Sequence, residues 1–283
     1  MSAEPAWTID ELITRYDLEP SLKDVIVEGL FDQDILNRCF FKIGDTARIC
    51  YPIDTINVPQ DLLSKHNLTD GNKQRVIALS KELESSLSEI ELGYRCLVDS
   101  DLDLWIAAKI NAKNLVRTKY TSLDLYFFDE SFLKYFFISV VKSKIINWSV
   151  FFNSFIDSLK SLYAIRLADH QLNTNLDWTS WSRCIVKEKS GLIKLDSQEY
   201  IKRILNKNSK ISELDAFLKA YNDWKGLLIK DPRLCIRGHD FIDLTSWVVG
   251  KFSANKSFTT PEAITTSLLL VAENAIDIID ELK

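Results

Sequence analysis

The stretch Val25-Ile26-Val27-Glu28-Gly29 is a run of β-branched residues that ends in a carboxylate and a glycine. A second run, Tyr94-Arg95-Cys96-Leu97-Val98, ends in Asp99-Ser100-Asp101-Leu102-Asp103. Continuous apolar runs of this length are typical of strands in a parallel sheet that helices cover on both faces. We therefore expect two strands whose carboxyl ends each carry acidic side chains.

Helical and strand-like segments alternate around these two runs. Thr8 and Glu11 have the spacing of a capping box, which predicts a helix from there to about Tyr16. Further along, the periodicity predicts helices over 32–41 and 72–92 and a strand over 47–56, and residues 115–126 contain a possible fourth strand, around 119–125. This order of strand, helix and strand is typical of a parallel α/β unit.

Beyond residue 129 the pattern becomes helical, and glycine and proline are rare within the periodic segments. Helical spacing predicts helices over 130–141, 148–168, 197–205, 212–228, 241–252 and 261–282. We therefore predict two domains. The first is an α/β domain over 1–129, with a small parallel sheet flanked by helices, and the second is a mainly α-helical region over 130–283.

The composition indicates a globular protein, with 46% hydrophobic and 27% charged residues in 283. The net charge of −5 argues against a chain that is basic throughout and binds nucleic acid by charge alone. A lysine-rich stretch over 183–210 could still form a local phosphate-binding face, although a solvated helix face would have the same composition. The five cysteines are widely spaced without a Cys-x-x-Cys pair, which favours buried, reduced thiols.

The sequence shows no sign of a membrane or secretory segment. No charged and then apolar leader opens the chain, and charged residues interrupt its most apolar stretch, 127–155. We expect a cytoplasmic protein with no membrane contact. A Walker-type phosphate-binding loop is also absent from the sequence, so any ATP hydrolysis linked to this protein would belong to another chain.

The acidic strand ends are the strongest chemical signal. Ligands of open α/β sheets bind at the carboxyl ends of the strands, and Glu28, Asp99 and Asp101 all fall there, with Asp103 extending the row. Crowded carboxylates raise one another's pKa unless a cation lies among them, and Mg²⁺ prefers oxygen ligands. The sequence therefore predicts a Mg²⁺ site, which Mn²⁺ could also fill. Glu28 could be a metal ligand or a general base, and the sequence does not separate the two roles.

Other residues have both a functional and a structural interpretation. Lys73 and Arg75 follow Gly71 at a helix start, where they could bind a substrate phosphate or form ordinary helix surface. His239, in Arg237-Gly238-His239-Asp240, could bind substrate or move a proton, or could have a structural role only. The aromatic-rich run 126–137 could stack on bases, but its lack of interleaved arginine favours a buried core.

The motifs together resemble a known family. Val25-Ile26-Val27-Glu28-Gly29-Leu30-Phe31-Asp32, Gly71-Asn72-Lys73-Gln74-Arg75-Val76 and Leu97-Val98-Asp99-Ser100-Asp101 are similar to the Toprim domain. Thr121-Ser122-Leu123-Asp124-Leu125-Tyr126 and the motif around His239 resemble a domain-of-unknown-function subgroup of Toprim nucleases that includes the AriB effector of PARIS anti-phage defence. Asp124 stands where that subgroup has a glutamate, and because its side chain is shorter we do not count it among the metal ligands.

The resemblance implies a Mg²⁺-dependent endonuclease with Glu28, Asp99 and Asp101 as catalytic residues. It also implies a toxin that an AriA-like ATPase holds inactive, that forms a homodimer when active, and that cleaves tRNA. Two alternatives remain open from the sequence: a Toprim enzyme that cuts DNA, and a Toprim-like interaction module without catalysis.

Overall fold

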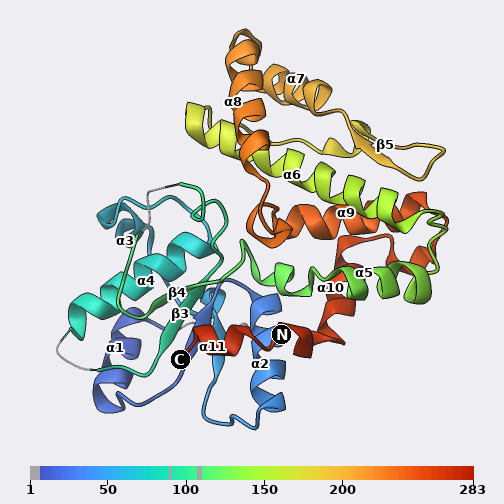
Figure 1. Ribbon diagram of the computed structural model, residues 1–283. Helices are drawn as coiled ribbons and strands as arrows, with labels where there is room; N and C mark the ends of the chain where they lie inside the picture. Colours follow the sequence, from blue (N-terminus) through green and yellow to red (C-terminus); the bar gives the residue numbers. More distant parts are fainter. Residues whose placement is uncertain (1–6, 89–90, 107–109) are drawn as a thin grey trace. The chain divides into compact units, whose positions relative to one another are not determined.

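The computed structural model describes residues 7–88, 91–106 and 110–283 (Figure 1). The chain forms two compact units. The first comprises Met1–Leu123 with Leu268–Lys283, and the second comprises Asp124–Ser267. This division differs from the expected boundary after residue 129, because the end of the chain joins the first unit.

The first unit contains a small parallel sheet, as the sequence predicts. Its strands are β1 (Val25–Val27), β2 (Cys50–Pro52), β3 (Arg95–Val98) and β4 (Leu115–Arg117), in the order β2-β1-β3-β4. Val25 pairs with Cys50 on one side and with Arg95 on the other, and Val98 pairs with Arg117. The chain adds β2 on one side of β1 and then crosses to add β3 on the other side. The strand order therefore reverses between β1 and β3.

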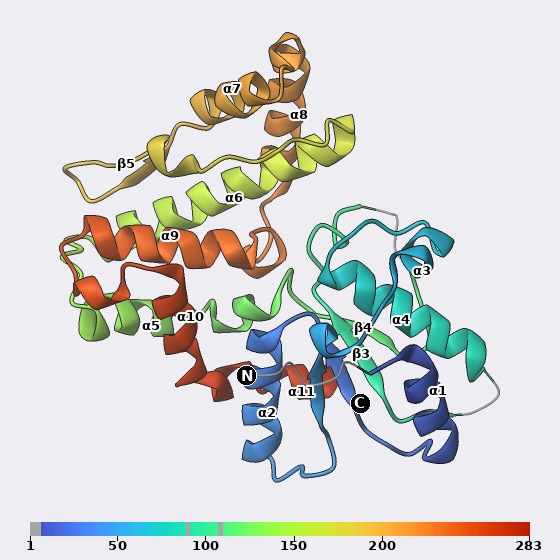
Figure 2. The same cartoon turned by 180° about the vertical axis from the view of Figure 1, so that it is seen from behind.

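Helices cover both faces of this sheet (Figures 1 and 2). The helices of the first unit are α1 (Ile9–Leu18), α2 (Leu30–Lys42), α3 (Gln60–Lys65), α4 (Asn72–Ser86) and α11 (Ile278–Glu281). Ile26, Cys96 and Val98 share one apolar cluster with residues of α1 and α4. Because side chains alternate along a strand, Val25, Val27 and Leu97, all buried, lie on the opposite face, where the figures show α2. Burial on both faces explains why Val25–Val27 in β1 and Cys96–Val98 in β3 are apolar throughout.

Four elements of the first unit differ from the sequence prediction. The strand predicted over 47–56 is a strand only at Cys50–Pro52, and Ile53–Thr55 is a 3₁₀ helix. The fourth strand is Leu115–Arg117, whereas Leu123–Phe127, within and beyond the predicted strand, is a 3₁₀ helix. Helix α3 lies between the segments 47–56 and 72–92 and was not predicted. Helix α4 ends at Ser86, short of the predicted end at residue 92, and residues 89–90 of that prediction lie outside the described part of the chain.

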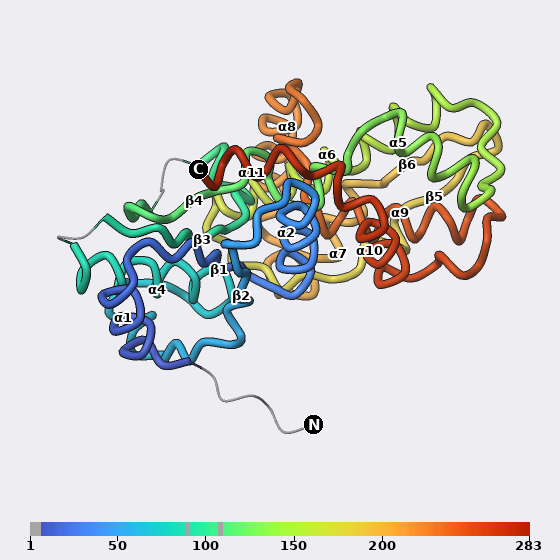
Figure 3. The backbone as a smooth tube through the Cα atoms, turned by 90° about the horizontal axis from the view of Figure 1, so that it is seen from below, coloured from blue at the N-terminus to red at the C-terminus, as the bar shows by residue number. Residues whose placement is uncertain are grey.

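The C-terminal segment packs on α2 and does not continue the single helix predicted over 261–282. After α10 (Pro261–Leu269) it forms a 3₁₀ helix at Ala272–Ala275 and then α11, which lies beside α2 (Figure 3). Glu273 pairs with Lys42 at 2.7 Å and with Arg38 at 3.6 Å. These contacts with α2 explain why the segment breaks into three short helices although its sequence has a continuous helical period.

The second unit is mainly helical, as predicted. Its helices are α5 (Glu130–Tyr135) with a π-helical turn at Phe136–Val140, α6 (Trp148–Leu172), α7 (Ser197–Lys207), α8 (Leu214–Leu227), α9 (Gly238–Lys251) and most of α10. Strands β5 (Ile185–Lys187) and β6 (Ile193–Leu195) form an antiparallel hairpin that the sequence did not predict. Helix α6 packs against α7, α8, α9 and β6.

Aromatic side chains fill the core of the second unit. The rings of Phe137, Phe151 and Phe155 lie within 6 Å of one another, centroid to centroid. This confirms the core interpretation for most of the aromatic-rich run, although Tyr135 is exposed. All five cysteines are buried and free, as expected. Among the described residues, no helix combines the length and apolar character needed to cross a membrane.

Candidate active site

The sheet topology brings the two acidic strand ends together. Glu28 follows β1 and Asp99 follows β3, and these neighbouring parallel strands flank the point where the strand order reverses. In open α/β sheets this is where ligands bind. One Glu28 carboxylate oxygen accepts a hydrogen bond of 2.8 Å from the backbone N–H of Asp99. The two strand ends are thus directly connected at the predicted site.

The Asp-x-Asp segment is a turn and does not extend the strand. Strand β3 ends at Val98, and Asp101 has a φ of +44°, in the left-handed region. The backbone N–H of Asp101 donates to the carbonyl of Thr121 at 2.7 Å, and one Asp99 oxygen accepts from the N–H of Leu123 at 3.0 Å. The 121–126 motif therefore holds both aspartates in place through its backbone. The expectation that Asp99 and Asp101 project in the same direction along a strand does not apply.

A lysine lies among the carboxylates. The Lys73 ammonium group is 3.0 Å from an Asp101 oxygen and 3.3 Å from an Asp103 oxygen, and its side chain is largely buried. Burial alone would lower the pKa of Lys73, but the charges of Asp101 and Asp103 raise it instead. The ammonium group is therefore a cation shared by two of the predicted metal ligands.

The electrostatics of the site centre on Glu28. Burial raises the pKa of Glu28 to about 7. The Asp99 N–H and the Lys73 ammonium act in the opposite direction, whereas the charges of Asp101 and Asp103 add to the increase. Glu28 thus exchanges a proton with solvent near neutral pH, which suits a general base.

The donor set has the chemistry that a hard divalent cation requires. Glu28, Asp99, Asp101 and Asp103 offer only carboxylate oxygens, the ligands that Mg²⁺ and Mn²⁺ prefer. Yet the described residues contain no group of three or more metal-binding side chains already arranged around one point. Lys73 takes up the space between Asp101 and Asp103. A cation bound by these two carboxylates would have to replace the ammonium group.

The other predicted substrate-binding residues lie in different surroundings. The Arg75 guanidinium binds the Asp54 carboxylate at 2.6 Å and the carbonyls of Ile53 and Ile56 at 3.2 and 3.1 Å. Arg75 therefore anchors the segment after β2. His239 is exposed in the first turn of α9 and belongs to the second unit.

Two residues of the site were not predicted. The Asn72 side-chain amide donates to the carbonyl of Glu28 at 2.8 Å, and this contact ties the start of α4 to the end of β1. The preceding Gly71 has a φ of +123°, which only glycine adopts easily. Arg117 at the end of β4 binds Asp103 at 3.0 Å. A correct placement of β4 would have put Arg117 at this edge of the sheet, because β4 is parallel to β3.

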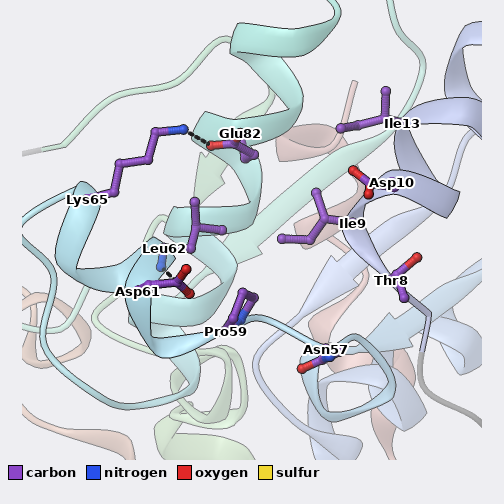
Figure 4. Close-up of a pocket in the computed structure, with 10 residues that line it drawn as sticks. All are labelled: Thr8, Ile9, Asp10, Ile13, Asn57, Pro59, Asp61, Leu62, Lys65 and Glu82. Atoms are coloured by element: carbon purple, nitrogen blue, oxygen red, sulfur yellow. Dashed lines mark hydrogen bonds and ion pairs between the residues drawn. The ribbon is translucent and has the colours of Figure 1, made fainter.

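A separate cavity of about 520 Å³ lies between α1, α3 and α4 in the first unit (Figure 4). Ile9, Ile13 and Leu62 supply apolar walls, and an ion pair of 2.7 Å joins Lys65 to Glu82 at its edge. None of its lining residues is one of the four candidate metal ligands, Glu28, Asp99, Asp101 and Asp103. It is therefore distinct from the candidate active site.

Comparisons with known proteins do not identify the chain. Neither a scan against models of protein families nor a search of curated proteins gave a match.

Proposed function

We propose that this chain is a Mg²⁺-dependent nuclease of the Toprim type, with the first unit as its catalytic unit. One observation supports this most. Acidic residues at the ends of β1 and β3 lie next to each other at the point where the strand order reverses. The raised pKa of Glu28 adds to it, because burial causes most of this increase and the nearby charges of Asp101 and Asp103 add to it.

The residues divide between metal binding and proton transfer. Asp101 and Asp103, with Glu28 or Asp99, would hold the metal ion. When bound, Mg²⁺ would polarise a phosphoryl oxygen and lower the pKa of a bound water. Glu28 accepts a proton at neutral pH, and the N–H of Asp99 keeps its carboxylate in one orientation. Lys73, once displaced from the aspartates, supplies a positive charge that suits a substrate phosphate.

The biological role follows from the resemblance to the AriB-like subgroup. We propose a toxin effector of anti-phage defence that an AriA-like ATPase keeps inactive, and that cleaves tRNA as a homodimer after its release. A basic surface would be needed for RNA binding. Lys187, Lys189, Lys194 and Lys202 are exposed on the β5–β6 hairpin and α7, which supports the predicted phosphate-binding face.

The decisive experiment compares RNA and DNA directly. Purified wild-type chain and its Glu28→Gln variant are incubated with Mg²⁺ or Mn²⁺ and either total tRNA or supercoiled plasmid. We expect metal-dependent cleavage of tRNA by the wild type only. Cleavage of the plasmid alone would favour the DNA nuclease, and equal cleavage by both proteins would show a contaminating nuclease and remove support for the proposal.

A second candidate is a non-catalytic interaction module. The ion pairs of Lys73 with Asp101 and Asp103 favour it, because they satisfy these carboxylates without a metal. A Mn²⁺ titration separates the two functions. Binding that Asp101→Asn abolishes would support the nuclease, whereas no binding by the wild type would support the module.

A further inference from the structure

The second unit contains a cavity of about 470 Å³ that is rich in tryptophan and arginine. This volume is typical of small-molecule sites, which are roughly 300–1,000 Å³. Trp178, Trp181 and Trp247 line it, together with Arg166 and Arg237. All five residues belong to the second unit, so the cavity exists independently of the acidic site.

One wall of the cavity is held rigidly. The Arg166 guanidinium forms two hydrogen bonds to the buried Asp240, Nε to Oδ2 at 3.1 Å and Nη2 to Oδ1 at 3.0 Å. The same guanidinium lies over the Trp178 ring, 4.3 Å from its centroid. Lys207 donates to the Trp178 carbonyl at 2.8 Å, which fixes the backbone as well. Trp178 is thus preorganised before any ligand arrives, which lowers the entropic cost of binding.

The rest of the lining supplies contacts for a flat, polar ligand. Trp178 and Trp247 are only partly buried, so each indole remains partly accessible from the cavity. Arg237 forms no hydrogen bond or ion pair with another described side chain, and Asp243 lies exposed at the rim. The lining therefore combines aromatic rings with a cationic donor and an anionic acceptor.

This combination selects one ligand chemistry. A trimethylated amine would bind in an aromatic cage as a cation, and the like charges of Arg166 and Arg237 in this lining would disfavour it. A nucleobase is a flat ring with donors and acceptors on its edge, and it stacks on aromatic side chains and arginine planes. Its phosphate would be neutralised by a guanidinium.

We propose that this cavity binds a nucleotide, with the base against Trp178 and Trp247 and the phosphate on Arg237. The nucleotide is either free or part of a single RNA strand, since both offer the same chemistry. The inference does not depend on the proposed nuclease function, because every residue that carries it lies in the second unit.

The test uses the full chain in EDTA, where no metal-dependent cleavage can occur. Tryptophan fluorescence is followed while the four ribonucleoside 5′-monophosphates, or short single-stranded oligoribonucleotides of A or U, are added. We expect saturable binding by the wild type. Trp247→Leu and Arg237→Gln should each weaken it by about tenfold or more.

Matched controls come from the same unit. Trp224→Leu and Arg233→Gln change residues outside the cavity lining and should bind as the wild type does. Tighter binding of oligoribonucleotides than of monophosphates would identify a strand as the ligand, and the reverse would identify a free nucleotide. The proposal is overturned if no probe binds, or if Arg237→Gln and Trp247→Leu, with unchanged circular dichroism, bind as tightly as the controls.

Discussion

The carboxylate of Glu28 and the backbone N–H of Asp99 form a hydrogen bond of 2.8 Å that joins the ends of β1 and β3. The bond partly compensates for the burial of Glu28, yet the pKa of Glu28 is still raised to about 7. A half-buried carboxylate with such a pKa is a feature of functional sites more often than of structural ones.

Replacement of Glu28 by glutamine tests its proposed role in cleavage. The glutamine side chain keeps an oxygen that can accept from the Asp99 N–H but loses the charge and the ability to take up a proton. We expect Glu28→Gln to lower the rate of tRNA cleavage by roughly 10²–10⁴-fold, the usual contribution of a general base. Initial rates at fixed Mg²⁺ measure this. The exposed Glu19→Gln is the control, and equal rates for the two variants would contradict the assignment.

The pH dependence of stability follows from the same carboxyl. Its pKa is about 7 in the folded chain against an ordinary value of 4.5. Between these values the folded state holds a proton that the unfolded state has lost, so the contribution of Glu28 to the free energy of unfolding is present below pH 4.5 and is lost as the pH rises through 7. The difference in unfolding free energy between wild type and Glu28→Gln should fall over this range, by on the order of 1–3 kcal/mol.

Urea denaturation in EDTA at pH 5 and pH 8 measures this difference. Subtracting the variant removes the titration of all other groups that both proteins share. A difference that stays constant between the two pH values, or that increases with pH, would contradict a raised pKa for Glu28.

Replacement of Lys73 tests its competition with a metal ion. Because its ammonium group lies 3.0 Å from Asp101 and 3.3 Å from Asp103, Lys73→Met leaves two carboxylates without this cation. We expect Mn²⁺ to bind more tightly to Lys73→Met than to the wild type, by about tenfold, as calorimetry can measure. Lys81→Met, on the same helix, should not change the affinity. Weaker binding by Lys73→Met would show that the lysine does not compete with the ion.

The sequence predicted the core of the site because short-range patterns encode it. Continuous apolar runs identified β1 and β3, and parallel pairing then placed Glu28 and Asp99 at one edge. The position of Lys73 depends on how α4 packs on the sheet, and local sequence patterns do not predict this packing. Its interaction with Asp101 and Asp103 therefore appears only in the structure.

The fourth strand lies at the start of the predicted range 115–126 and not around 119–125, and this shift has a local cause. Leu115–Arg117 is short and only partly buried, so its apolar signal is weak. The residues that follow are rich in threonine and serine, which resemble a strand in sequence but bond to the backbone here. The Thr118 hydroxyl donates to the carbonyl of Tyr120 at 2.7 Å and accepts from the N–H of Ser100 at 3.0 Å. Such local bonds compete with strand formation.

In the second unit, the ion pair between Arg166 and Asp240 should stabilise the fold, and loss of one partner should cost more than loss of both. Asp240 is 3% exposed, and Asp240→Leu would leave the largely buried guanidinium of Arg166 without its carboxylate. We expect a loss of about 3–5 kcal/mol in the free energy of unfolding. The double variant Arg166→Met with Asp240→Leu should recover at least half of this loss, because no unpaired charge remains. Urea denaturation of the three proteins measures both effects, and additive losses would contradict the pairing.

The C-terminal segment should stabilise the first unit. Ala275 and Ile278 are fully buried, and the Cys39 thiol of α2 lies 3.5 Å from the carbonyl of Ala272. Ile278→Ala should therefore lower the free energy of unfolding by roughly 2–5 kcal/mol. Leu270→Ala, at a site that is 84% exposed in the same segment, should change it by less than about 0.5 kcal/mol.

A fragment that ends at residue 129 extends this test to the domain boundary. It contains every strand of the sheet but lacks 268–283, so the apolar residues of α2 that pack on this segment would be exposed to water. We expect the fragment to be unfolded or aggregated under conditions in which the full chain is folded, as circular dichroism and gel filtration can show. A monomeric fragment with the stability of the full chain would mean that the first unit is complete without the end of the chain.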